Sequence, residues 1–229
     1  MDAAAADKIL QEDTKHNHFR VTIFGSARIK KGDHWYKEVF HLAKNIAKQD
    51  VDIVTGGGPG IMEAANEGHY AGRRPESNAH SIGMTIQLPW ENEPNEYLDV
   101  QRHFHRFSNR LDYFMALSHV VVVMPGGIGT CLELFYTWQL TQVHHMLKIP
   151  IILRGRMWNG LVEWVKKEPV ARGLVSPEDM DNIYVVKNSD EALEIIYEYH
   201  QKFLDPKNTE YRKKYTLESL LQTKKEKGK

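Results

Sequence analysis

The sequence predicts an α/β fold, with a doubly wound, largely parallel sheet and helices on both faces. Strand-like and helix-like segments mostly alternate along the chain, which is the order expected when crossover helices join parallel strands. Several strand-like segments are short runs rich in valine and isoleucine, typical of strands that are buried on both faces. Two of these runs lead directly into glycine-rich segments, as expected where a strand turns into a helix.

The elements can be placed in order from composition and spacing. Strand-like composition occurs at residues 19–25, 51–54, 81–87, 120–124, 150–153 and 183–186. Helical spacing of apolar residues occurs at residues 35–48, 61–71, 102–118, 129–147, 158–167 and 190–203. No linker or internal repeat divides the pattern, so we expect one domain over residues 19–203. An N-terminal arm or short helix (1–18) and a charged C-terminal tail (204–229) would flank it.

The helix expected at residues 102–118 carries an apolar face that includes Phe107, Leu111 and Phe114. Arg110 lies on the stripe beside that face, at the border between core and surface. A guanidinium at such a border can be held in place while its planar fork faces a cleft. A solvated helix arginine fits the same spacing, so both interpretations stay open at this point.

The segment PGGIGT (residues 125–130) follows the all-valine run 120–123 and opens a helix expected to begin near Gly129. Glycines there allow a close approach of ligand to backbone. The first turn of the helix presents N–H groups and the positive end of its dipole to an anion. This segment therefore predicts a binding site for a phosphate-bearing ligand.

Glu133 places a carboxylate in what we expect to be the first turn of that helix, where it would repel a bound phosphate. A structural interpretation is available, because Thr130-x-x-Glu133 has the spacing of a capping box. A chemical role for the carboxylate is the alternative, and this motif alone does not decide between them.

A second glycine segment, TGGGPG (residues 55–60), follows the strand-like run 51–54 and precedes a helix that begins with Ile61 and Met62. Two strand-glycine-helix units in one doubly wound sheet can converge on a single crevice at the carboxyl ends of the strands. The pair therefore favours one shared ligand site over two unrelated tight turns.

These residues resemble a known family. The segments GGGPGIM (residues 56–62) and PGGIGTxxE (residues 125–133) are similar to the paired signatures of the LONELY GUY proteins. The resemblance extends over about residues 19–203, including FGSAR at 24–28 and the arginine Arg110. It implies a Rossmann-like phosphoribohydrolase that cuts the N-glycosidic bond of a nucleoside 5'-monophosphate, releasing free base and ribose 5-phosphate. Plant-type members act on cytokinin ribotides, and bacterial members on those or on ordinary purine and pyrimidine nucleotides.

The resemblance also implies roles for particular residues. Glu133 would be catalytic, stabilising the oxocarbenium-like state and orienting or deprotonating the attacking water. Arg110 would position Glu133 or neutralise charge on the phosphate, because a guanidinium is a poor general acid. The residues expected to bind substrate are Ser26, Gly57, Gly58, Gly60, Met62, Pro125, Gly126, Gly127, Gly129 and Thr130.

Two positions depart from the family pattern. Leu111 follows Arg110 where the family often has lysine, and Leu132 precedes Glu133 where it often has a second glutamate. These changes put the substrate preference in question and leave the bond-breaking residues in place.

Composition excludes several other functions. The 229 residues carry 30 acidic and 30 basic side chains, so no overall field attracts nucleic acid. Cys131 is the only cysteine, which excludes an intrachain disulfide and fits a reducing, cytoplasmic compartment. The beginning of the chain lacks the pattern of a secretory signal, and no apolar run approaches the length of a membrane span.

Lysine and histidine positions disfavour three further kinds of chemistry. No lysine occurs between Lys48 and Lys148, the span that holds both glycine segments. A Walker-type phosphate loop and a pyridoxal phosphate Schiff base both need a lysine, and neither has one beside these motifs. The histidine pairs at 103/105 and 144/145 lack a matching set of carboxylate or cysteine ligands. We therefore expect no metal and no cofactor.

Three functions from different classes remain at this point. A nucleotide N-glycosidase would lose turnover but keep binding when Glu133 is replaced by glutamine. A non-catalytic nucleotide or molybdenum-cofactor carrier would bind without forming product. A dinucleotide-dependent oxidoreductase is disfavoured because FGSAR (24–28) stands where Gly-x-Gly-x-x-Gly is expected. The family resemblance also implies a homodimer or larger homo-oligomer, for which Tyr136, Trp138 and Met146 are candidates, although all three fit a core position equally well.

Overall fold

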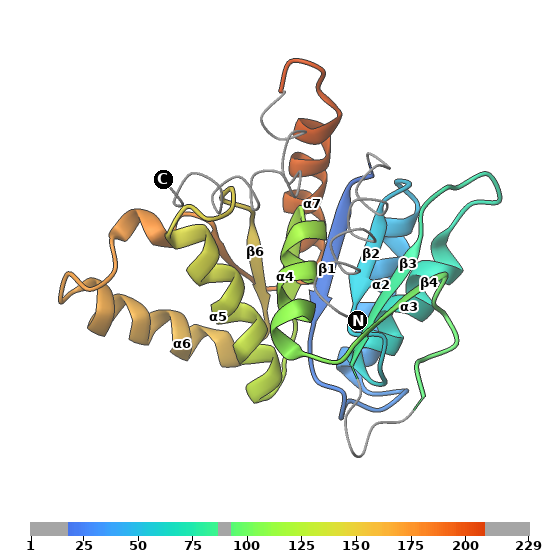
Figure 1. Ribbon diagram of the computed structural model, residues 1–229, viewed down its shortest axis with the longest axis horizontal. Coiled ribbons are helices and arrows are strands. Elements are labelled where there is room, and N and C mark those ends of the chain that lie inside the picture. Colours follow the sequence, from blue (N-terminus) through green and yellow to red (C-terminus); the bar gives the residue numbers. More distant parts are fainter. Residues whose placement is uncertain (1–17, 87–92, 209–229) are drawn as a thin grey trace, which may run out of the picture.

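The protein folds around one parallel sheet with helices on both faces (Figure 1). The computed structural model describes residues 18–86 and 93–208. The strands are β1 (Arg20–Phe24), β2 (Asp52–Thr55), β3 (Ser81–Ile86), β4 (Val100–Phe104), β5 (Val120–Val123), β6 (Ile151–Arg154) and β7 (Ile183–Val186). The helices are α2 (His34–Ala47), α3 (Ile61–Gly72), α4 (Phe107–Leu117), α5 (Ile128–Gln142), α6 (Met157–Val165) and α7 (Ser189–Leu204). A π-helical turn (Lys166–Val170) and a 3-10 turn (Pro177–Met180) complete the described elements.

The predicted fold class is confirmed. The sheet has seven strands in the order β4-β3-β2-β1-β5-β6-β7, and every neighbouring pair is parallel. After β1 the chain builds outward on one side as far as β4, then returns to the centre and builds outward on the other side. The direction therefore reverses between β1 and β5, and doubly wound sheets bind ligands at the carboxyl ends of the strands at such a point.

Alternate residues of the central strands serve two separate cores. Val21 and Ile23 of β1 face α2, α3 and α7, which cover one side of the sheet. Val121 and Val123 of β5 face α4, α5 and α6 on the other side. These side chains are fully buried, as the period of two in a strand requires when both faces are covered.

One predicted helix is partly wrong. The pattern at 102–118 predicts one continuous helix, but residues up to Phe104 form β4 and only Phe107–Leu117 are helical. Residues 100 and 104 have partners at 82 and 86 of β3. A strand pairing partner distant in sequence overrides an apolar spacing that suits a helix locally. The histidines at 103 and 105 accordingly lie on and just after a strand rather than on a helix.

The helix after β5 also differs from expectation at both ends. It begins at Ile128 with Gly127 as its N-cap, and it ends at Gln142 rather than at 147. The early end coincides with His144, whose positive φ of 54° is incompatible with a continuing helix. Thr130 thus occupies the third helical position, no side chain caps the helix, and Glu133 lies in the second turn. The capping-box interpretation of Thr130 and Glu133, one of the two left open, is therefore excluded.

Some predictions fall outside the described residues. The arm at 1–17, Gln87 at the end of the third predicted strand, and the tail beyond residue 208 belong to this group. None of the helices in the described ranges combines the length and the apolar character that a membrane crossing requires. The expected roles of Trp138 and Met146 are partly resolved, because both side chains are buried in the core on the α5 side of the sheet.

Candidate functional site

Three loops meet at the carboxyl edge of the sheet, where the strand order reverses. The backbone N–H of Ser26, after β1, donates to the carbonyl oxygen of Pro125, after β5, at 3.0 Å. The carbonyl oxygen of Ser26 accepts from the N–H of Ile61, which opens α3 after β2, at 3.1 Å. The loop that carries Ser26 therefore joins the two predicted glycine segments.

The contact between the first two loops depends on Gly60. Its φ is +72°, and a Cβ at this position would lie 2.5 Å from the carbonyl oxygen of Ser26 and 2.7 Å from the carbonyl carbon of Ala27. Both features exclude an L side chain unless the backbone moves. Gly60 is therefore needed for the close approach of these two loops.

We predict that Gly60→Ala destabilises the fold by about 2 kcal/mol or more, from the left-handed conformation and the backbone clash together. Gly160→Ala is the matched control: Gly160 lies within α6, and a Cβ added there would meet no atom within 4 Å. That change should be neutral or stabilising by about 0.5–1 kcal/mol. Urea unfolding of the two variants measures the difference, and equal stability would contradict the assigned packing.

The glycine segment at residues 125–130, second of the two along the chain, is packed at one end and open at the other. The side chain of Thr130 is buried, and its Oγ1 would lie 2.1 Å from a Cβ on Gly126. An added Cβ on Gly127 or Gly129 would meet no atom within 4 Å. Thr130 therefore packs against the loop, whereas Gly127 and Gly129 border open space at the N-terminus of α5, where the helix dipole favours an anion.

The first glycine segment lies over Met62 and beside Arg110. A Cβ on Gly56 would lie 2.6 Å from the sulfur of Met62 and 4.0 Å from Nη1 of Arg110. A Cβ on Gly58 would lie 2.9 Å from the methyl carbon of Met62. The thioether thus fills the space that these two glycines leave, and the guanidinium lies next to the loop.

Arg110 comes from the first turn of α4 and reaches Glu133 in the second turn of α5. Its Nη2 lies 3.5 Å from Oε1 of Glu133, and the two side chains are only 13% and 14% exposed. The guanidinium also lies over the rings of Phe107 and Phe114, at 5.4 and 5.7 Å from their centroids. The position of Arg110 at the border of an apolar face is as predicted.

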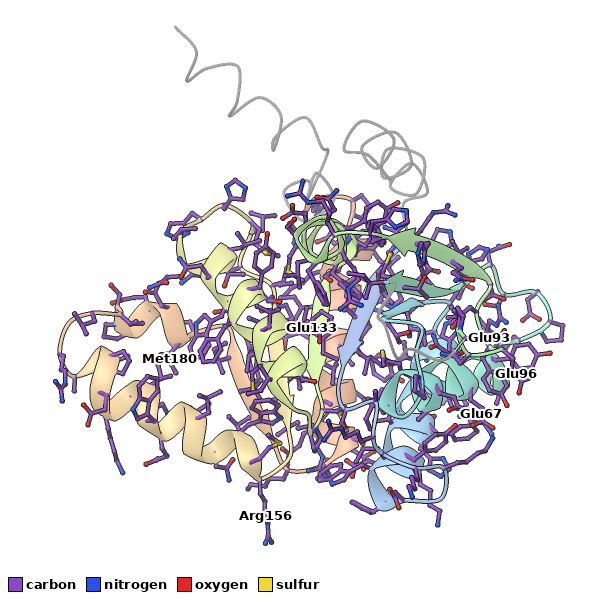
Figure 2. The ribbon with its side chains drawn as sticks, turned by 60° about the horizontal axis from the view of Figure 1, so that its bottom comes forward. Glu67, Glu93, Glu96, Glu133, Arg156 and Met180 are labelled. Atoms are coloured by element: carbon purple, nitrogen blue, oxygen red, sulfur yellow. The ribbon has the colours of Figure 1, made fainter. Side chains whose placement is uncertain are left out.

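Burial raises the pKa of Glu133 to about 7, against the attraction of Arg110, which lowers it. The desolvation effect outweighs the ion pair. The pKa of this carboxyl group therefore lies much closer to neutral pH than that of an exposed glutamate, in the range in which a side chain best serves as an acid or base. Figure 2 shows Glu133 near the middle of the molecule, well apart from Glu67, Glu93 and Glu96.

The structure thus brings together residues that are far apart in the chain. Arg110 lies close to both Glu133 and the first glycine segment, and the loop after β1 fastens the two glycine segments to each other. Within the predicted set, Gly57, Gly60 and Thr130 are buried and pack against the protein, whereas Gly127 and Gly129 are exposed. Among the described residues, no three side chains of His, Cys, Asp or Glu gather as metal ligands would.

Sequence reasoning missed Asn95 at this site. Its side-chain Nδ2 donates to the carbonyl oxygens of Gly57 and Gly58, each at 3.0 Å. It lies in an irregular segment before β4, where neither periodicity nor a glycine pattern marks it. An asparagine beside a proline, at 94–95, was the only local signal, and it indicates no more than a turn.

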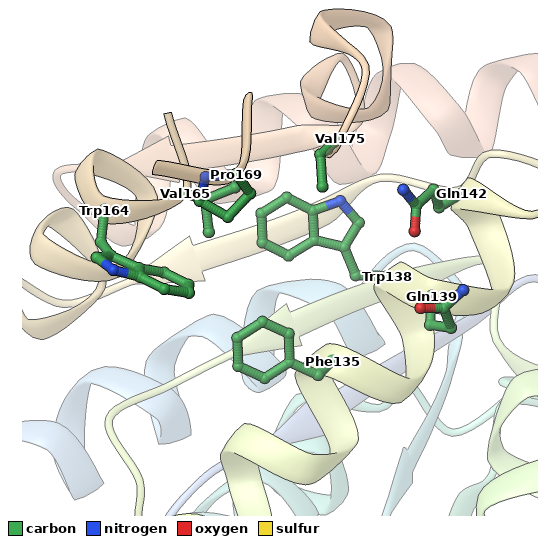
Figure 3. A pocket seen from close by; sticks show the side chains of 8 residues that line it. All are labelled: Phe135, Trp138, Gln139, Gln142, Trp164, Val165, Pro169 and Val175. Carbon is green, nitrogen blue, oxygen red and sulfur yellow. The ribbon is translucent and has the colours of Figure 1, made fainter. Parts of the chain in front are cut away.

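A pocket of about 200 Å³ lies elsewhere, between α5 and the segment from α6 to Val175 (Figure 3). Phe135 and Trp138 line it from α5, and Trp164 and Pro169 line it from the other side. At 100° per residue, Phe135 points about 160° away from Glu133 around the helix. The pocket is therefore separate from the site that Glu133 and Arg110 form.

Comparison with known proteins assigns the chain to a family. A family model described as "Possible lysine decarboxylase" matches residues 62–196. The chain belongs to this family. It is the LONELY GUY family that the two glycine motifs indicated. The matched region contains Arg110, the second glycine segment and Glu133. It contains no lysine before Lys148, so neither motif has beside it the lysine that a pyridoxal phosphate decarboxylase would need.

A curated protein also matches part of the chain. The pyrimidine/purine nucleotide 5'-monophosphate nucleosidase of Escherichia coli K12 is 28% identical over 140 residues, which are 59% of this chain and 30% of that protein. The matched region thus spans 30% of the length of that protein.

Solved structures show the same fold at lower identity. The molybdenum cofactor carrier protein of Chlamydomonas reinhardtii is 17% identical, with a TM-score of 0.57, and the match covers 80% of this chain and 99% of that one. The molybdenum cofactor binding protein of Rippkaea orientalis is 18% identical, with a TM-score of 0.56 and coverage of 79% and 94%. At these identities the likeness concerns the fold alone.

Proposed function

We propose that this LONELY GUY family member hydrolyses the N-glycosidic bond of nucleoside 5'-monophosphates to give the free base and ribose 5-phosphate. The observation that carries the proposal is the buried pair of Glu133 and Arg110, 3.5 Å apart, at the reversal point of the sheet beside two glycine segments. Similarity to a nucleotide nucleosidase over 59% of the chain supports it.

The chemistry follows from the charge that develops on the ribose. As the bond from C1' to the base nitrogen breaks, the base leaves with the electron pair and the ribose becomes cationic, like an oxocarbenium ion. The ionised Glu133 stabilises that cation and accepts the proton of the water whose oxygen attacks C1'. The departing base takes a proton from solvent, so the overall reaction consumes one water.

Arg110 has a positioning role in this scheme. Stacked on two aromatic rings, its guanidinium keeps Glu133 in one place and favours its ionised form. The open backbone at Gly127 and Gly129 holds the 5'-phosphate at the N-terminus of α5. Ser26 and the first glycine segment, with Met62 beneath it, form the other wall.

A substrate panel tests the proposal. The purified protein is incubated with purine and pyrimidine nucleoside 5'-monophosphates and a cytokinin ribotide, and the released base is measured by chromatography. The matched controls are the corresponding nucleosides, which lack the phosphate that the glycine segments are proposed to hold. We expect base from at least one monophosphate and at least 100-fold less from its nucleoside. Tight binding without product across the panel would instead identify a nucleotide or cofactor carrier on the same fold.

We further propose that a second copy of this chain covers the outer stripe of α5. Ile128, Leu132 and Phe135 recur at helical spacing and are 86%, 46% and 42% exposed. The stripe continues into the apolar pocket beside Trp164. Exposed apolar side chains grouped in this way mark an interaction site, and in a symmetric dimer the same stripe would meet its copy.

Phe135→Glu is predicted to convert the assembled protein to a monomer. Light scattering after gel filtration measures the mass, with Tyr70→Glu as the matched control. Tyr70 is 61% exposed on α3, which covers the other face of the sheet. A wild-type protein that is already monomeric at micromolar concentration would overturn this part of the proposal.

A further inference from the structure

The loop between β2 and α3 is held by a carboxamide from a distant segment. Asn95 donates twice to the carbonyl oxygen of Gly57, from its backbone N–H at 2.9 Å and from Nδ2 at 3.0 Å. The same Nδ2 lies 3.0 Å from the carbonyl oxygen of Gly58. Two consecutive carbonyl groups of the glycine segment are thus tied to one side chain.

This arrangement fixes the direction of the loop amides. A trans peptide group is planar, so its N–H points away from its carbonyl. With the carbonyl of Gly57 turned toward Asn95, the N–H of Gly58 must point to the opposite side. The N–H of Gly57 is already used, because it donates to Oγ1 of Thr55 at 3.0 Å. The hydrogen bonds of Asn95 therefore set which backbone N–H groups of the first glycine segment can point toward a ligand.

The side chain of Asn95 also belongs to a buried network of hydrogen bonds. Nδ2 of Asn95 lies 3.0 Å from Oδ1 of Asn66, which also accepts from the hydroxyl of Thr55 at 2.9 Å. Asn66 in turn donates to the hydroxyl of Ser81 at 2.7 Å. Asn66, Thr55 and Ser81 are fully buried, so each donor and acceptor is costly to leave without a partner.

The segment that carries Asn95 is itself fastened on both sides. The side chain of Leu98 fills the space beside Gly57 and Gly83, 3.2 and 2.5 Å from where their Cβ atoms would be. The next residue, Asp99, exchanges two hydrogen bonds with Ser81, at 2.9 Å through its N–H and 2.7 Å through its carboxylate. The residues that follow Asn95 are therefore packed and hydrogen-bonded against β3.

We propose that Asn95 is a positioning residue for the nucleotide site, acting through the first glycine segment on the affinity for the substrate. The hydrogen bonds of its carboxamide nitrogen run to the glycine loop and to Asn66, so it is expected to act on binding and not on the bond-breaking step. The effect on nucleotide affinity rests on the function proposed above, whereas the effect on the loop does not.

Asn95→Asp is the decisive variant because it preserves shape and removes the donors. At pH 8 the carboxylate would face three acceptors, the carbonyl oxygens of Gly57 and Gly58 and Oδ1 of Asn66. We expect the KM for the preferred monophosphate to rise about 10- to 100-fold, with kcat within about threefold of wild type. The ratio of variant to wild-type KM should shrink at pH 5.5, because a protonated carboxyl group regains one donor.

Asn45→Asp is the matched control. It makes the same change of charge at the end of α2, at the other edge of the sheet, where its oxygen still accepts from Lys48. This control should leave KM at the wild-type value at both pH values. A fall in kcat with unchanged KM in Asn95→Asp would overturn the proposal.

Hydrogen exchange on the ligand-free protein tests the effect of Asn95 on the loop separately from its effect on nucleotide affinity. Asn95→Asp should raise exchange at least tenfold in the peptide that covers residues 56–61, and leave β1 and β5 at wild-type rates. This result is expected even if the wild type releases no base, in which case only the proposed function fails. Unchanged exchange in the loop, or an increase spread equally over all strands, would overturn the positioning role.

Discussion

Replacing Glu133 by glutamine is expected to reduce base release by at least 100-fold, and by as much as 10,000-fold, while the nucleoside 5'-monophosphate still binds. The amide has nearly the shape of the carboxyl group but can neither stabilise the ribosyl cation with a negative charge nor take a proton from water. Single-turnover assays with saturating nucleotide measure the loss, and calorimetry measures the affinity that remains.

The matched control for that experiment is Glu163→Gln. Glu163 is an exposed glutamate of α6 that pairs with Lys167, so its neutralisation should leave turnover unchanged. Folding is checked on the same samples. The pKa of Glu133 is raised in the folded protein, so ionising it costs stability as the pH rises from its unfolded value near 4.5 through about 7. The glutamine variant should therefore gain in stability relative to wild type between pH 5 and pH 8.

The pH profile is the second prediction with a large effect. If the ionised form of Glu133 is required, kcat/KM falls tenfold for each pH unit below its pKa of about 7. Activity at pH 5 should therefore be about 100-fold lower than at pH 8. Initial rates at low substrate concentration across this range measure the ascending limb, which reports the free enzyme.

Arg110→Gln tests whether the ascending limb of the pH profile reports the titration of Glu133. Arg110 lowers the pKa of Glu133 against the larger effect of burial. Removing the guanidinium should move the ascending limb to higher pH, in addition to lowering the maximum rate. A limb that stays at the same pH in this variant would assign the titration to another group and contradict the proposed role of Glu133.

The glycine motifs and the strand pattern predicted the sheet well, for a physical reason. Buried parallel strands need continuous apolar runs, and the turns after β2 and β5 need residues without a Cβ, so both leave local marks in the sequence. The placing of Arg110 at the border of an apolar helix face was also readable from 3.6-residue spacing. These features depend on neighbours in the chain.

What the sequence could not show depends on partners far along the chain. Residues 102–104 were assigned to a helix that continues to 118, and it is their pairing with β3 that makes them part of a strand. The same holds for Asn95, whose partners Gly57 and Gly58 lie 38 and 37 positions away. The spacing of Thr130 and Glu133 also fits a capping box, but α5 begins at Ile128 and Glu133 lies in its second turn. The contact of Glu133 with Arg110 joins two helices and leaves no local mark in the sequence.

The most direct test of the central claim is the product balance of a single reaction. The preferred nucleoside 5'-monophosphate is incubated with the wild-type protein in phosphate-free buffer, and free base and ribose 5-phosphate are quantified together. The account predicts equal amounts of the two products, at many molecules per molecule of protein. Stoichiometric binding with neither product, or release of nucleoside and phosphate instead, would contradict it.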